Sequence, residues 1–299
     1  MSALPDAQIY VLEGVFSSSF ATLRAQNLCP VLNSVDQCVL WSPSDLPAAL
    51  QLDSGMARLG LSAEEIALVL RDHAIDVRLL LSHFARADEL EHDFTVQQTR
   101  SVMGIFAELR QHRPGLRLSL NNSAACLGGV ALPAGIEQLG RAGVGLYGGN
   151  PLASGKASDV GLKPVVSVFG KVLQVRGIKA GTPVGYGGTY TAIADERVMI
   201  VGVGYADGVP RLLSNQGHIF VKGKRCAIRG RVSMDMLHAD ASKVDVAVGD
   251  WVEVMGANIC VDDIAAQAQT ISYEVFTGLG KRLHRVYRND SESGLIEGR

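Results

Sequence analysis

Polar side chains follow several apolar runs in the first 150 residues, each near the point where a run ends. They are, in chain order, Asp53, Arg58, His83, Asn122, Ser123, Arg141 and Gly143. A hydroxyl and backbone N–H groups at a helix start can cradle a phosphate, while arginine and histidine can address a carboxylate and a ring nitrogen. The set therefore predicts a site for an anionic, phosphate-bearing ligand.

Taken singly, these residues have simpler explanations. His83 can be a structural hydrogen-bonding group, Asn122 and Ser123 can cap the next helix, and Arg141 can be a surface arginine. What favours a site is that they end successive predicted strands, because parallel barrels gather their active-site residues at the carboxyl ends of the strands.

A second candidate group lies in the later half, in Val203–Gly208. Tyr205 is either a core aromatic residue or a proton-transfer group. Because the reference pKa of tyrosine is about 10, the second role needs a nearby positive charge to lower it. By spacing alone, Arg231–Asp235 and Ile271–Glu274 are structural, and each is glycine-flanked or strand-like.

The elements that must position the first group alternate between short apolar runs and amphipathic stretches. Ser62–Glu65 has the pattern of a capping box, and 95–109 has helical spacing. Alternating strands and helices predict parallel βα units, and nearly continuous apolar strands predict a sheet buried on both faces. Six strands are either a complete open sheet or part of an eight-stranded barrel. The predicted strands are 9–15, 30–34, 49–55, 76–84, 116–123 and 144–148.

Beyond about residue 160 the pattern changes to alternating apolar and polar residues separated by glycine-rich turns, which predicts a mostly antiparallel β domain. One helix is expected at 261–269, and the Gly- and Ser-rich stretch 149–161 is a plausible linker. The predicted strand regions are 163–175, 197–203, 218–232 and 250–255.

Composition restricts the class of protein. A formal charge of -2 without a basic run argues against nucleic acid or an anionic membrane as partner, and no apolar run is long enough to span a bilayer. Five scattered cysteines without C-x-x-C spacing favour free thiols, no metal site and a cytoplasmic location. The tail 291–299 ends in IEGR, which matches a protease-cleavage linker or is a natural polar end.

Eight ordered motifs resemble the alanine racemase family from about residue 5 to 288. The resemblance implies an incomplete TIM-type (β/α) barrel at 1–158, a mostly antiparallel β domain at 159–290, pyridoxal 5'-phosphate (PLP), and a homodimer with shared sites. It also implies interconversion of L- and D-alanine through a PLP aldimine, which supplies D-alanine for peptidoglycan of the cell wall. The matching runs are LDSGMARLG (52–60), SHFARAD (82–88), NNSAA (121–125), LGRAGVGLYG (139–148), GTPVGYGGTYTA (181–192), VGYADGVPR (203–211), GRVSMDM (230–236) and TISYEVFTGL (270–279).

The resemblance also implies roles for individual residues. Tyr205 looks like the base that exchanges a proton on one face of the substrate, in the partner chain's barrel. His83 looks like the residue behind Tyr205, or packed against the cofactor ring and hydrogen-bonded to Arg141, and Arg141 looks like the arginine facing the pyridine nitrogen. The cofactor phosphate is matched by Asn122, Ser123, Gly143, Val144 and Tyr273. The substrate carboxylate is matched by Arg58 and Met234, and the entrance and its support by Asp88, Arg231, Asp235 and Ile271.

Two departures from the family pattern stand out. Gln51 occupies the position where many members have a carbamylated lysine, so Arg58 is expected to be oriented by an amide or a bound anion. The lysine that binds the cofactor, which the family carries at the end of its first barrel strand, is absent, because the first lysine of this chain is Lys156. The first recognisable strand resembles the family's third, so we expect a chain that starts two βα units late and is inactive as it stands.

Several alternatives stay open. The missing segment is explained by truncation, by a wrong start or by degeneration. The activity is that of an alanine racemase, of a racemase for serine or another small amino acid, or of a non-catalytic PLP-fold relative, and the role is biosynthetic or catabolic.

Overall fold

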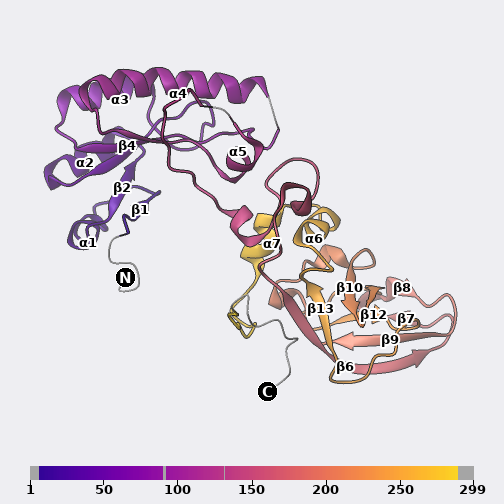
Figure 1. Cartoon of the computed structure of the whole chain (residues 1–299). Coiled ribbons are helices and arrows are strands. Elements are labelled where there is room, and N and C mark those ends of the chain that lie inside the picture. The colour runs from indigo at the N-terminus through magenta and orange to yellow at the C-terminus, as the bar shows by residue number, and fades with distance from the viewer. Residues whose placement is uncertain (1–6, 90–91, 131, 289–299) are drawn as a thin grey trace. The chain divides into compact units, whose positions relative to one another are not determined.

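The computed structural model describes residues 7–89, 92–130 and 132–288, and the predicted tail at 291–299 lies outside them. The chain forms two compact units, each described here by itself (Figure 1). The first contains the residues up to Gly145 together with Pro151–Gly155, and the second contains Leu146–Asn150 together with the chain from Lys156 onward. The chain therefore crosses between the units after Gly145, after Asn150 and after Gly155, and the last two of these points lie within 149–161, the stretch that the sequence suggests as a linker.

The first unit is a parallel α/β layer. Its five strands lie in chain order, β1-β2-β3-β4-β5, and every neighbouring pair is parallel. The strands are β1 (Tyr10–Val11), β2 (Cys29–Leu32), β3 (Ala48–Gln51), β4 (Val77–Leu81) and β5 (Arg117–Ser119). The helices are α1 (Phe20–Ala25), α2 (Val35–Trp41), η1 (Ser42–Ser44), α3 (Ala63–Asp72), α4 (Asp93–His112) and α5 (Ser123–Gly128). The 3-10 helix η2 (Val144–Tyr147) contains the point at which the chain first passes to the second unit. The predicted parallel βα organisation is confirmed.

Local sequence signals explain the two longer helices. The Ser62 side chain accepts from the Glu65 N–H, and the Glu65 carboxylate accepts from the Ser62 N–H, so the predicted capping box starts α3. The helix expected at 95–109 is α4, and its buried side chains recur at helical spacing.

The sheet is buried on both faces, as its apolar strands predict. All residues of β2 and β3 are buried. Val31, Ala49, Leu79 and Leu81 form a small cluster on one face, and the alternate residues of the same strands belong to the larger core under the helices.

The sixth predicted strand is wrong. Residues 144–147 form the 3-10 helix η2, and the edge of β5 is instead met by two isolated parallel bridges, Leu118 with Gln138 and Asn122 with Arg141. Glycines at 143 and 145 have no side chain to pack against a neighbouring strand, so packing does not stabilise an extended conformation of this run. The bridge at Asn122 still places Arg141 beside the end of β5.

The second unit is built on an antiparallel sheet of order β11-β10-β13-β6-β9-β12, which confirms the predicted β domain. Its strands are β6 (Val168–Ile178), β9 (Glu196–Val201), β10 (His218–Val221), β11 (Lys224–Ala227), β12 (Leu237–Asp240) and β13 (Trp251–Met255). A separate hairpin joins β7 (Pro183–Val184) and β8 (Tyr190–Thr191). Short 3-10 turns are η3 (Ala157–Val160), η4 (Tyr186–Gly188), η5 (Tyr205–Asp207) and η6 (Arg211–Leu213).

Two helices accompany this sheet, α6 (Val261–Gln267) and α7 (Ser272–Gly278). The helix expected at 261–269 is confirmed, but the strand-like interpretation of Ile271–Glu274 is wrong, because Ile271 is the residue that caps α7. Ser272 and Val275 are the buried residues of α7, and this spacing of three fits one helical face better than one face of a strand.

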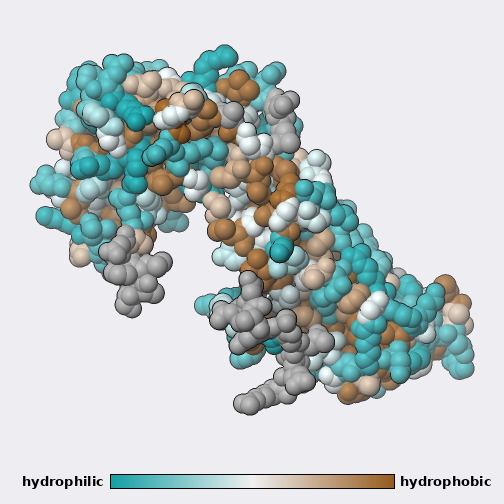
Figure 2. All heavy atoms as spheres, viewed as in Figure 1, coloured by the Kyte–Doolittle hydropathy of each residue, from teal (hydrophilic) through white to brown (hydrophobic). Residues whose placement is uncertain are grey.

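The surface contains both polar and apolar side chains. In the space-filling view, hydrophilic and hydrophobic residues are mixed over the visible face of each unit (Figure 2). All five cysteines are free, and burial raises the pKa of Cys29 to about 11 and that of Cys38 to about 12. Within the described residues, no helix is both long and apolar enough to cross a membrane.

Candidate active site

Arg141 is the centre of the polar cluster in the first unit. Its backbone N–H donates to the Asn121 carbonyl at 2.9 Å, which fixes the residue beside the end of β5. One terminal nitrogen donates to the Ser119 hydroxyl at 2.6 Å, and the other donates to the Ser82 carbonyl at 2.7 Å. The Ser119 hydroxyl in turn donates to the Leu139 carbonyl at 2.7 Å. The guanidinium is therefore held by groups that follow or end two neighbouring strands.

The same guanidinium contacts His83, whose Nδ1 lies 3.1 Å from the Arg141 terminal nitrogen. Since arginine only donates, Nδ1 must accept, which places the imidazole proton on Nε2. Burial, with the positive charges of Arg141 and Arg58, lowers the pKa of His83 to about 4, and burial lowers that of Arg141 to about 10. At neutral pH the pair is a neutral imidazole and a charged guanidinium.

Donors suited to a phosphate-sized anion lie at the start of α5, at Ser123, and in the neighbouring loop at Gly143. Ser123 is buried, and its hydroxyl oxygen accepts from the Gly143 N–H at 2.6 Å, which leaves the hydroxyl proton able to donate elsewhere. A Cβ at residue 143 would lie 3.6 Å from that oxygen. The Asn122 side chain accepts from the Ala125 N–H, so Asn122 caps α5, which is the structural role that the sequence also allows for it.

Loop residues after β3 divide into structural and exposed groups. The Asp53 carboxylate accepts from the backbone N–H groups of three loop residues, so it shapes the turn. Buried Gln51 donates to the Leu59 carbonyl at 2.9 Å and thus holds the backbone next to Arg58, which is exposed. The Asp88 carbonyl accepts from the Ala153 N–H at 3.0 Å.

In the second unit, Tyr205 begins the turn η5, and it is 43% exposed, so its interpretation as a core aromatic is wrong. Its N–H donates to the Ser233 carbonyl at 3.0 Å, and the next N–H, at Ala206, donates to the Met234 carbonyl at 3.0 Å. Gly204 makes this close approach possible, since a Cβ there would lie 2.4 Å from the Met234 carbonyl oxygen.

The remaining candidates of the second unit are Arg231, Asp235, Ile271 and Tyr273. Arg231 lies against the turn η4, where a Cβ at Gly187 would approach its guanidinium to 2.9 Å. Asp235 pairs with Arg282 at 2.6 Å. Ile271 and Tyr273, at the start of α7, are 61% and 44% exposed. All four border exposed surface, as ligand-facing residues must.

The site residues therefore form two sets. The first unit brings together Asn122, Ser123, His83, Arg141, Gly143 and Val144 at the end of its sheet. The second unit brings Tyr205 together with Met234 through the two turns.

Two residues near these sets are missed by sequence reasoning. Asn121 is buried, and its Oδ1 has no hydrogen-bond partner in the described part of the chain. It lies two residues after Ser119, the last residue of β5, and within the strand predicted at 116–123, so the period of two could have assigned it to the same face. Arg282 contacts Asp235 across 47 positions of sequence, and no local pattern predicts that contact.

PLP can be tested against these residues. The Ser123 hydroxyl, the Val144 N–H group and the Arg141 guanidinium are donors that fit a phosphate and a ring nitrogen, and the Gly143 N–H orients the Ser123 hydroxyl. Asn121, which precedes Asn122 in the chain, has a buried Oδ1 without a hydrogen-bond partner among the described residues. The first lysine of the sequence is Lys156, which follows all of the residues named here.

Comparisons with known proteins agree over both units. Family models match residues 1–151 as "Alanine racemase, N-terminal domain" and residues 165–287 as "Alanine racemase, C-terminal domain". A catabolic alanine racemase of Rhizobium johnstonii is 40% identical over 297 residues, covering 95% of this chain and 76% of that protein. An alanine racemase of Rhodospirillum rubrum is 39% identical, covering 94% of this chain and 76% of that protein.

Solved structures are similar as well. Biosynthetic alanine racemase from Pseudomonas aeruginosa matches with a TM-score of 0.84 and 38% identity, covering 95% of this chain and 80% of that one. Alanine racemase from Bartonella henselae, solved with covalently bound pyridoxal phosphate, matches with a TM-score of 0.84 and 31% identity, covering 96% of this chain and 81% of that one.

Proposed function

Because the chain belongs to the alanine racemase family, a family of isomerases, we propose that its residues bind PLP and alanine and exchange the α-proton of the amino acid at Tyr205. The observation that carries the proposal is the cluster at the end of β5, where a charged Arg141, a neutral His83 and the Ser123–Gly143 pair lie together. Such a cluster provides donors for a phosphate and for an aromatic nitrogen at once.

The cofactor is assigned to residues of this chain as follows. Asn122, Ser123, Gly143, Val144 and Tyr273 hold the phosphate, and Arg141 faces the ring nitrogen. When bound, PLP supplies an electron sink that acidifies the α-hydrogen of an amino acid. Because a guanidinium gives up its proton so reluctantly, Arg141 donates a hydrogen bond to the ring nitrogen without protonating it, and this weakens the sink and limits side reactions.

The substrate is held and deprotonated by other groups. Arg58 and the Met234 backbone bind the carboxylate of alanine, and Tyr205 gives and takes the proton on one face. Asp88, Arg231, Asp235 and Ile271 line or support the entrance and so select for a small amino acid. We place Tyr205 in the site of the partner chain of a homodimer, so that each site is shared.

A racemase needs a base on each face of the substrate, and this chain supplies only the tyrosine. Since residues 1–155 contain no lysine, we propose that the 299-residue chain binds PLP reversibly and does not racemise alanine at enzymatic rates. This also keeps open the competing function of a non-catalytic PLP-binding relative.

The relatives do not decide the metabolic role. One relative is named catabolic and another biosynthetic, at 40% and 38% identity, so supply of D-alanine for the cell wall and breakdown of D-alanine are equally compatible. Free thiols support a cytoplasmic location.

The test uses the purified chain and PLP. We expect PLP to bind and to be removed by dialysis, and a solution of L-alanine to keep its optical rotation. Loss of optical rotation at an enzymatic rate contradicts the proposed inactivity. Failure to bind PLP at millimolar concentration contradicts the cofactor assignment itself.

A further inference from the structure

The turn that carries Tyr205 is clasped between two other segments of the second unit. On one side lies the end of α7 and the residues after it. A Cβ at Gly208 would lie 2.7 Å from the Gly278 carbonyl oxygen and 2.9 Å from the Leu279 Cα. The backbone of the turn therefore packs directly on the backbone of the following segment, with no side chain between them.

On the other side lies the turn Ser233–Asp235. The N–H groups of Tyr205 and Ala206 donate to carbonyl groups of this turn. The two backbones lie so close together that a Cβ at Gly204 would be 2.3 Å from the Ser233 carbonyl oxygen. The proton-transfer residue and the backbone assigned to the substrate carboxylate thus belong to two turns in mutual contact.

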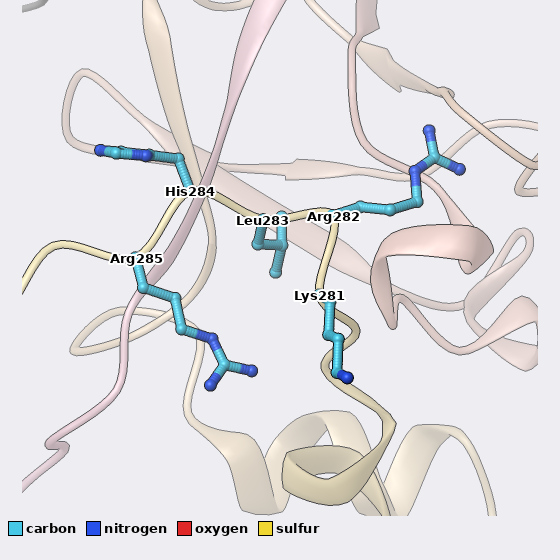
Figure 3. A pocket seen from close by; sticks show the side chains of 5 residues that line it. All are labelled: Lys281, Arg282, Leu283, His284 and Arg285. Atoms are coloured by element: carbon cyan, nitrogen blue, oxygen red, sulfur yellow. The ribbon is translucent and has the colours of Figure 1, made fainter.

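Arg282 joins all three segments. Its Nε lies 3.4 Å from an Asp207 carboxylate oxygen, and a terminal nitrogen lies 2.6 Å from an Asp235 carboxylate oxygen. Figure 3 shows its side chain extending in a direction different from those of Lys281, His284 and Arg285, although all belong to one stretch of chain. One guanidinium therefore reaches the turn of Tyr205 and the turn of Met234 at the same time.

The carboxylate on the Tyr205 turn depends on this contact. Asp207 is 8% exposed, and one of its oxygens accepts from the Gly204 N–H at 2.9 Å while the other faces Arg282. A carboxylate so nearly buried is costly without a cation or further donors. Contact with Asp235 and with Asp207 raises the pKa of Arg282 in return, so the cation is permanent at neutral pH.

We propose that Arg282 is a positioning residue that fixes the Tyr205 phenol relative to the Met234 backbone. The role rests on the proposed function of Tyr205 and Met234, and it adds a residue that touches neither substrate nor cofactor. Arg282 determines how far the proton-transfer group stands from the carboxylate anchor, and this distance decides which substrate α-carbons the phenol can reach.

The contact is local in its effect on stability. The Arg282 side chain is 51% exposed, and exposed ion pairs contribute little to the free energy of unfolding. Its loss should loosen the two turns while the sheet of β6, β9 and β13 stays folded.

Amide hydrogen exchange of the cofactor-free chain tests this. In Arg282→Ala we expect the N–H groups of Tyr205 and Ala206 to exchange about fivefold faster, while amides of β6 and β9 keep their rates. Arg282→Lys keeps the charge but loses the planar fork, so it should restore protection only in part. Salt at about 1 M should accelerate exchange in the unchanged chain and have no further effect on Arg282→Ala.

Arg285→Ala is the matched control. Arg285 lies in the same stretch but makes no ion pair with Asp207 or Asp235 among the described residues, and its hydrogen bond to the Leu279 carbonyl is long at 3.4 Å, so its removal should leave exchange at Tyr205 unchanged. Unchanged protection in Arg282→Ala overturns the inference, and so does equal acceleration in β6 and β9, which would indicate general destabilisation. Because the measurement needs no cofactor, a failure to bind PLP counts against the proposed function and leaves this result intact.

Discussion

The Arg141 cluster and the Tyr205 turn are built by opposite means. Around Arg141, a half-buried guanidinium is held by a serine hydroxyl, a histidine nitrogen and carbonyl oxygens, and burial lowers the pKa of both Arg141 and His83. Around Tyr205, the side chain itself is exposed, and glycines and backbone hydrogen bonds fix only the main chain.

This difference matches the tasks proposed for them. A residue that must keep one protonation state beside a cofactor benefits from burial and a fixed set of partners. A tyrosine that exchanges a proton with a substrate needs a solvent-exposed side chain, because its hydroxyl must reach the bound substrate, and a rigid backbone that fixes its position. Variants of the Arg141 cluster should therefore change binding and stability, whereas removal of the Tyr205 hydroxyl should change neither.

The largest effect is expected from Arg141→Ala. Four hydrogen bonds from a charged donor are lost, and the Ser119 hydroxyl and His83 Nδ1 lose a partner. We expect PLP affinity to fall about 100-fold and the free energy of unfolding to fall by about 2–3 kcal/mol. Spectrophotometric PLP titration and urea unfolding measure the two, and Arg141→Lys should recover little of the affinity because the fork is lost. Unchanged affinity would remove Arg141 from the cofactor site.

A pH effect of similar size is expected at His83. Its pKa in the fold is about 4, below the value of about 6.5 of the unfolded chain, so the fold favours the neutral imidazole. The contribution to stability is therefore complete above pH 6.5 and is lost as the pH falls towards 4; it amounts to about 1–2 kcal/mol, because the ring is only partly buried and solvent screens its charge.

His83→Gln is the control for this effect, since its amide oxygen can accept from Arg141 without titrating. Unfolding by urea at several pH values should show a steeper loss of stability between pH 6.5 and 4 for the unchanged chain than for the variant. Parallel curves would mean that His83 titrates normally and that its burial is relieved in solution.

Sequence reasoning finds the elements whose signals are local and misses the contacts that are not. The capping box at Ser62 and the apolar alternation of the later half predict α3 and the antiparallel sheet, because each signal acts within a few residues. The run at 144–148 fails because apolar character alone does not distinguish a strand from a tight glycine-flanked turn.

For the sites the limit is physical as well. Residues at strand ends can be assigned to one edge of a parallel sheet. This assignment predicts that His83 and Arg141 lie close together, and in the structure they are in contact. The Asn121 oxygen is notable because no other group among the described residues reaches it, and the ion pairs of Arg282 with Asp207 and Asp235 join residues far apart in the sequence. Neither is encoded in spacing.

The smallest effect is expected from Tyr205→Phe, which tests whether the exposed Tyr205 side chain has any structural role. The phenol ring is 43% exposed, and the hydrogen bonds that fix the residue come from its backbone, which the substitution keeps. We expect the free energy of unfolding to change by less than about 0.5 kcal/mol, as for substitutions away from buried networks. Urea unfolding checks this, with Tyr190→Phe as the contrasting variant, because the Tyr190 hydroxyl donates to Glu196 at 2.7 Å and its loss should cost about 1–2 kcal/mol. A loss at Tyr205 as large as that at Tyr190 would mean that the phenol has a structural partner, and the exposed proton-transfer role would then have to pass to another group.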